Sequence, residues 1–151
     1  MKTASVATLA MRFMIMHLND FEFNETLEQV QLEVVKQNGN VIKFIKNPSE
    51  QVQLEAVKQN GLVIKFIKNP SDQVQLEAAK QYGYSIQHIE NPSEKVQLEA
   101  VKQNGAIQYI KNPSEQVQLA AIKQNYKNCL FINNLTKEMK NLVIKNYRLR
   151  D

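Results

Sequence analysis

The 151-residue chain has the composition of a folded protein, with 43% hydrophobic residues, 23% charged residues and a formal net charge of +4. No apolar run is long enough to cross a bilayer, and the single cysteine, Cys129, excludes an intramolecular disulfide. The excess charge lies within residues 126–151, which hold six cationic and two acidic residues, so the remainder is neutral. We expect a soluble cytoplasmic protein whose body offers no large groove for nucleic acid.

Residues 1–24 form the first predicted element, an N-terminal cap. Lys2 and the apolar residues after it resemble a secretory signal, but Arg12 and His17 interrupt the run and no small-residue cleavage site follows. In a helix, one face would carry Val6, Leu9, Ala10, Phe13 and His17. The pattern predicts an amphipathic helix over residues 4–18 that covers one end of the core.

Five repeats of about 22 residues follow, and they are the dominant signal of the sequence. The string Asn-Pro-Ser-Glu/Asp begins at positions 47, 69, 91 and 112, glycines recur at 39, 61, 83 and 105, and a near-constant VQLEAVKQNG runs between them. We delimit the units as 25–46, 47–68, 69–90, 91–111 and 112–133. Residues 134–151 then form a C-terminal cap and basic tail, beginning like a decayed sixth unit.

Each unit opens with the signals of a helix. Asn47 is expected as the N-cap and Pro48 as the first helical residue, with Glu50 reaching back to the cap. Gly61 is expected to end this helix, about thirteen residues long, in a left-handed conformation. The sequence therefore predicts one long helix per unit.

A short apolar segment, such as residues 62–68, completes each unit. Its β-branched residues suit a strand, which would produce a horseshoe of the leucine-rich kind. The isoleucines at 64 and 67 are three residues apart, and unit four keeps this spacing although it is one residue shorter, which favours a short helix. The fold predicted is therefore an all-α solenoid of about five helix–turn–helix repeats with a capping helix at each end.

Stacking of the units predicts continuous columns of side chains. The apolar columns are Val30, Val52, Val74, Val96 and Val117; Leu32, Leu54, Leu76, Leu98 and Leu119; and Ile42, Ile64, Ile86 and Ile107. An aromatic column of Phe44, Phe66, His88, Tyr109 and Phe131 runs alongside them. A glutamine column, Gln31, Gln53, Gln75, Gln97 and Gln118, falls within the apolar arc, so each amide should bond to the backbone of an adjacent turn or unit.

The motif Val-Gln-Leu-Glu-Ala-Val-Lys-Gln-Asn-Gly resembles the core of a short α-helical repeat family known as domain of unknown function 4116, found in bacterial, phage and giant-virus proteins. The resemblance covers residues 25–133. It implies a helical solenoid of microbial or viral origin in a bacterial or host cell, and it implies no activity.

The sequence contains no catalytic, metal-binding or cofactor-binding constellation, so we expect no enzyme and no cofactor. The two histidines, His17 and His88, lack metal-ligand spacing, and His88 replaces an aromatic residue of the column. Glutamates 33, 55, 77 and 99 stand three residues before lysines 36, 58, 80 and 102, as expected of solvated ion pairs on a helix surface.

A protein-binding scaffold or inhibitor, for instance of a host defence protein, is the function predicted. Unit 69–90 departs most from the repeat, so the partner site is predicted at Tyr82, Tyr84, His88 and Tyr109, on the face of the short segments, with drift in a decaying repeat as the alternative. The alternative function is nucleic-acid binding by Lys36, Lys58, Lys80, Lys102 and Lys123 together with the basic tail, Lys140, Lys145, Arg148 and Arg150. We expect no membrane partner, and self-association through a solenoid end remains open.

Overall fold

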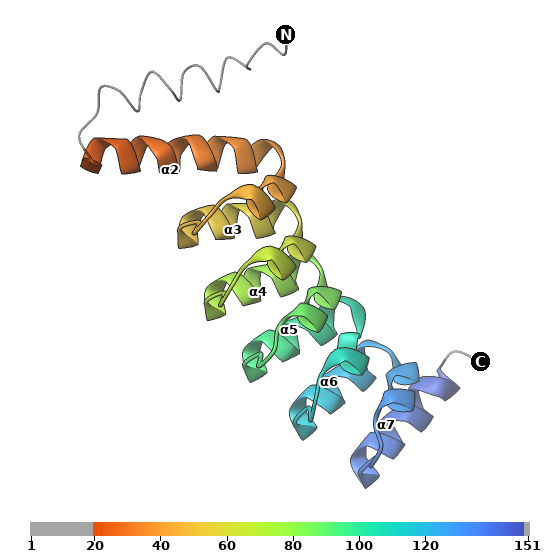
Figure 1. Ribbon diagram of the computed structural model, residues 1–151. Coiled ribbons are helices and arrows are strands. Elements are labelled where there is room, and N and C mark those ends of the chain that lie inside the picture. The colour runs from red at the N-terminus through yellow and green to blue at the C-terminus, as the bar shows by residue number, and fades with distance from the viewer. Residues whose placement is uncertain (1–19, 150–151) are drawn as a thin grey trace.

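The chain folds into a solenoid in which long α-helices alternate with short 3₁₀-helices, as the sequence predicts. The computed structural model describes residues 20–149, so the helix predicted over residues 4–18 lies outside the described residues. Its elements, in chain order, are α2 (Asp20–Gln37), η1 (Gly39–Phe44), α3 (Glu50–Gln59), η2 (Gly61–Phe66), α4 (Asp72–Gln81), η3 (Gly83–His88), α5 (Glu94–Asn104), η4 (Ala106–Tyr109), α6 (Glu115–Gln124), η5 (Tyr126–Phe131) and α7 (Lys137–Arg148). Each long helix packs on the next in sequence, and α2 and α7 lie at opposite ends of the stack (Figure 1).

Serine, not asparagine, is the N-cap of α3, α4, α5 and α6, and Thr136 is the N-cap of α7, so this part of the prediction is wrong. The Ser49 hydroxyl accepts a hydrogen bond from the Val52 amide at 3.3 Å, and α3 begins at Glu50. Asn47, the predicted cap, instead has a φ of 54°. Asparagine tolerates this left-handed conformation, and the residue before a proline avoids the right-handed helical region, so Asn47 turns the chain two residues before the N-cap Ser49.

Asparagine, not glycine, ends α3, which corrects the prediction of a left-handed glycine stop. Asn60 is extended, and its side chain accepts a hydrogen bond from the Leu62 amide at 3.0 Å, which starts the short helix. Gly61 is required by close packing, because a Cβ there would lie 2.6 Å from the Ala78 carbonyl oxygen of the next unit. Only Gly105, in the unit that lacks one residue, has the expected positive φ, 64°.

The second segment of each unit is a helix, as favoured above, but of the 3₁₀ type. In η2 the Val63 amide donates to the Asn60 carbonyl and the Ile67 amide to the Ile64 carbonyl, at 3.1 and 3.0 Å. A 3₁₀-helix has three residues per turn, so it keeps Ile64 and Ile67 on one side. Both isoleucines are buried, and the core therefore continues from the long helices into the short ones.

The predicted apolar columns form one continuous core, except that Val30, the first member of the valine column, is only half-buried. Val52, Val74, Val96 and Val117 are fully buried, and so are the isoleucines of the short helices, whereas most of the leucines are half-buried. The glutamine column is confirmed from Gln53 onward: its side-chain Nε2 donates to the Pro48 carbonyl at 2.9 Å, and the same bond recurs at Gln75, Gln97 and Gln118. These amides tie each long helix to the turn that precedes it.

A second ladder joins neighbouring units and replaces the predicted capping box. Glu50 does not reach back to its own cap; its carboxylate accepts a hydrogen bond from the Ser71 hydroxyl of the next unit. The same pairing links Ser49 to Glu28, Ser93 to Asp72 and Ser114 to Glu94. Because bonds to a carboxylate are stronger than neutral ones, this ladder fixes the register between units.

Candidate partner-binding surface

The aromatic column predicted within the stack is a surface feature. Phe44 is 76% exposed, Phe66 and Tyr109 are each 42% exposed and Phe131 is 51% exposed; His88 is exposed as well. Ile64 in η2 and Ile67 directly after it take the inward positions, so the two residues between them face solvent. Since the short helices pack side by side, these residues form a row, called the aromatic row below, along one face of the solenoid.

Three of the four residues predicted as the partner site lie together. The Tyr82 and Tyr84 ring centroids are 5.3 Å apart, and those of Tyr84 and Tyr109 are 5.7 Å apart, both edge to face. Tyr84 is half-buried against the core, whereas Tyr82 and Tyr109 are exposed. Tyr84 thus supports the two outer rings, one of which, Tyr109, belongs to the aromatic row.

His88 belongs to the row but not to the tyrosine cluster. It lies with Tyr109 on a groove of about 630 Å³, whose lining includes Glu90 and Gln97, and it also borders the equivalent groove of the preceding unit, about 450 Å³. Partial burial, and then the nearby charge of Lys65, lower the pKa of His88 below its ordinary value of 6.5. The lowered pKa favours the neutral imidazole, in which one ring nitrogen donates and the other accepts a hydrogen bond.

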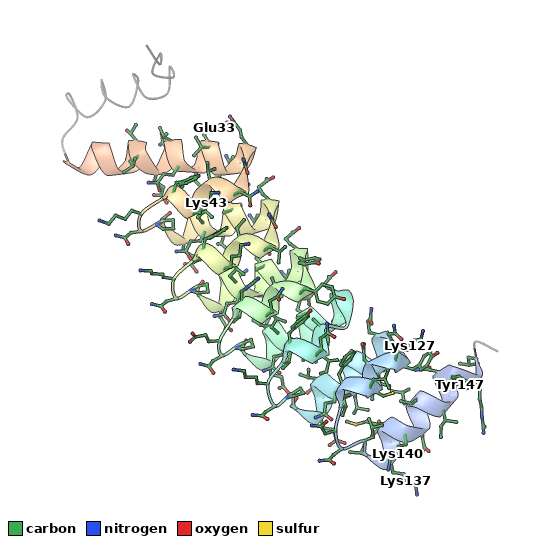
Figure 2. All side chains as sticks on the ribbon, turned by 45° about the vertical axis from the view of Figure 1, so that its right-hand side comes forward. Glu33, Lys43, Lys127, Lys137, Lys140 and Tyr147 are labelled. Carbon is green, nitrogen blue, oxygen red and sulfur yellow. The ribbon has the colours of Figure 1, made fainter. Side chains whose placement is uncertain are left out.

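Lysines flank the aromatic row in the first two units. The Lys43 Nζ lies 4.7 Å from the ring centroid of Phe44, and the Lys65 Nζ lies 5.0 Å from that of Phe66 (Figure 2 labels Lys43). These distances are in the range of cation–π contacts. The repeated string Lys-Phe-Ile-Lys at 43–46 and 65–68 could have revealed this arrangement in the sequence, but the pairing depends on both residues facing solvent.

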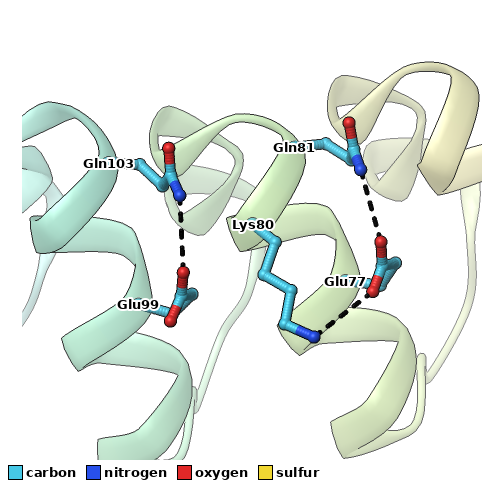
Figure 3. Close-up of polar contacts among 5 residues, drawn as sticks. All are labelled: Glu77, Lys80, Gln81, Glu99 and Gln103. Carbon is cyan, nitrogen blue, oxygen red and sulfur yellow. Dashed lines mark hydrogen bonds and ion pairs between the residues drawn. The ribbon is translucent and has the colours of Figure 1, made fainter.

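Two of the four predicted glutamate–lysine pairs on the long helices form ion pairs among the described residues. Lys58 pairs with Glu55 at 3.9 Å and Lys80 with Glu77 at 3.6 Å. Glu77 also accepts a hydrogen bond from the amide of Gln81, four residues later, as Figure 3 shows; the same contact recurs between Gln103 and Glu99. These contacts stay within one helix, and the acids weaken the positive field that a phosphate backbone would need.

The basic tail lies on α7. Lys140, Lys145 and Arg148 are exposed, and Arg150 lies outside the described residues. Cys129 is half-buried in η5 and packs against the core. The tail is therefore the charged surface of the last helix and stands apart from the tyrosine cluster in the middle units.

Comparison of the chain with protein-family models, with curated proteins and with solved structures gave no match. Within residues 20–149, no three His, Cys, Asp or Glu side chains gather as a metal site would require. In the same part of the chain, every helix is too short or too polar to cross a bilayer.

Proposed function

We propose that this chain is a non-catalytic protein-binding scaffold or inhibitor, and that the aromatic row on its short-helix face holds the partner. The observation that carries the proposal is the exposure of an aromatic or histidine ring at one register position in five consecutive units. A core-forming position would be covered, as Ile64 and Ile86 are in the same short helices.

The chemistry of the row suits a protein surface. Aromatic side chains are the commonest anchors of protein interfaces, and contiguous exposed apolar surface is unusual on a monomer that binds nothing. The Tyr82–Tyr84–Tyr109 contacts hold two exposed rings in a fixed geometry, which lowers the entropy lost on binding. The grooves beside His88 add polar groups that can orient a partner.

Affinity capture from lysate of the source cells tests the proposal. The chain and a variant carrying Phe66→Ser and Tyr109→Ser are immobilised, and bound proteins are quantified by mass spectrometry. Lys80→Ser on the long-helix surface is the matched control. We expect a protein that the wild type and the control retain and the row variant loses; equal retention by all three would contradict the proposal.

Nucleic-acid binding is the second candidate, and the interleaved lysines and phenylalanines of η1 and η2 favour it. Single strands bind proteins through bases stacked on aromatic rings and phosphates beside cations. Retention of single-stranded DNA or RNA that falls steeply with salt, and is lost in Lys43→Glu with Lys65→Glu, would support this candidate over the first.

A further inference from the structure

The C-terminal end of the solenoid contains an apolar hollow that the proposed function does not use. It lies between η5 and α7, is open to solvent, has a volume of about 260 Å³ and has an apolar surface. Its lining residues are Tyr126, Lys127, Cys129 and Leu130 from η5 and Val143, Ile144 and Tyr147 from α7. A cavity of about 150 Å³ holds a benzene-sized ring, so this hollow has room for a large apolar side chain.

The repeat itself shows that the position is normally covered. Ile144 is 48% exposed, whereas the residues at the same register in the four preceding units, Val57, Ala79, Val101 and Ile122, are all 0% exposed. In those units a short helix follows and packs on the long helix. Within the described residues no short helix follows α7, whose last turn ends beside the exposed Leu149.

The place of the hollow indicates the shape of its occupant. In the preceding units, each short helix contacts the long helix before it and the neighbouring short helix. The hollow is bounded by α7 and η5, which are the equivalents of those two contacts. A helix from outside the described chain therefore fits where a sixth short helix would lie, whereas a flat lipid surface does not match a recess between two helices.

The charge of α7 indicates which kind of helix the hollow would bind. α7 carries Lys137, Lys140, Lys145 and Arg148 against one carboxylate, Glu138. At 100° per residue, Lys137, Lys140 and Arg148 all fall within about 40° of Ile144, while Glu138 falls about 120° away. Lys127 adds a cation from η5 and lines the hollow with Tyr147. Figure 2 labels Lys127 and Tyr147 toward one end of α7 and Lys137 and Lys140 toward its other end. A second copy of α7 would place like charges together.

We propose that this hollow binds an acidic amphipathic helix of a partner protein. The apolar side chains of that helix fill the recess over Ile144, Tyr147 and Leu130, and its carboxylates pair with the cations of α7. The inference does not rest on the proposed function, because the aromatic row and the hollow share no residue.

Model peptides test the site on the full chain. The probe is a stapled helix with leucine at i, i+3, i+4 and i+7 and glutamate elsewhere; its counterpart carries lysine for glutamate. Fluorescence anisotropy at two salt concentrations measures both. We expect saturable binding of the glutamate peptide, weakened by salt, and affinity at least about tenfold lower for the lysine peptide.

Three variants locate the binding. Ile144→Ser should lower the affinity for the glutamate peptide by about tenfold or more, and Lys137→Glu with Lys140→Glu should reverse the preference between the two peptides. Phe44→Ser, in the aromatic row, should change neither, with thermal melting checking that each variant folds. Equal affinity for both peptides, no binding of the glutamate peptide, or binding unaffected by Ile144→Ser would overturn the proposal.

Two further outcomes would assign the hollow to another occupant and overturn the proposal. One is a dimer in sedimentation velocity that Ile144→Ser dissociates, since a second copy would then cover the recess. The other is binding to anionic vesicles that depends on Ile144 and exceeds binding of the glutamate peptide.

Loss of partner capture in the Phe66→Ser, Tyr109→Ser variant with peptide binding intact would show that the two surfaces act independently.

Discussion

Ser85 is a buried polar residue at a position where the preceding unit is apolar. Its side chain is 0% exposed, and its hydroxyl has no hydrogen-bond partner among the described residues. Val63 holds the same register in η2 and is also 0% exposed. Ala79 stands where that unit has the larger Val57. We therefore expect unit three to accommodate a larger side chain at position 85. Replacing Ser85 with valine should therefore stabilise the fold.

The magnitude follows from two terms. Removing a buried hydroxyl without a partner recovers about 1–3 kcal/mol, and each additional buried carbon contributes about 0.8 kcal/mol. Tight packing around the new methyl groups offsets part of this gain. We expect Ser85→Val to raise the free energy of unfolding by about 1–3 kcal/mol, where 1 kcal/mol shifts the Tm of a domain this size by about 2–4 °C.

Urea and thermal unfolding followed by circular dichroism measure the effect. The reciprocal variant Val63→Ser is the matched control, because it places the same hydroxyl at the same register of η2 and should lose about 1–3 kcal/mol. A Ser85→Val variant that is less stable than the wild type would refute the reasoning, since it would mean that the hydroxyl is bonded or that unit three lacks the space.

Three other substitutions follow from the contacts of single units. Gly61→Ala should destabilise the fold by about 1–3 kcal/mol in urea unfolding, because its Cβ would meet the Ala78 carbonyl oxygen at 2.6 Å; an unchanged midpoint would show that the units can separate. Gln53→Ala removes the bond to the Pro48 carbonyl and should cost about 1 kcal/mol, and a neutral result in the same assay would mean that the glutamine ladder does not stabilise the stack. Tyr82→Asn restores the helix cap seen at Asn60, which stabilises by about 1 kcal/mol, and removes the ring contact with Tyr84, which is of similar magnitude. The Tm should therefore change little while partner capture falls. Unchanged partner capture would exclude Tyr82 from the site.

The repeat architecture could be predicted from the sequence because a constant spacing between similar residues indicates that successive units pack on one another in the same way. Val52, Val74, Val96 and Val117 are buried as the 22-residue spacing predicts. Gln53 bonds to backbone, as a partly buried amide must. The short helices followed from the three-residue spacing of Ile64 and Ile67. These inferences concern which residues face the core. Because each unit repeats the same pattern of apolar residues, the sequence provides several independent indications of the same inward positions.

Local contacts that depend on the neighbouring unit could not be predicted in the same way. Asn47 and Ser49 are both good caps, and only the geometry shows that Ser49 also donates to Glu28 of the preceding unit. Gly61 reads as a helix stop, but the reason for glycine there is the carbonyl of the next unit. Phe66 reads as a core residue, and its exposure follows from the 3₁₀ turn, which places both isoleucines inward.

The most direct test of partner binding by the short-helix face is site-specific photocrosslinking. A photoreactive phenylalanine analogue placed at Phe66 or at Tyr109 keeps the ring of the native side chain, and one at Lys80 samples the long-helix surface. Irradiation in lysate of the source cells should yield the same protein adduct from Phe66 and Tyr109 and none from Lys80. An adduct formed from Lys80 alone would contradict the account and place the partner on the long-helix surface.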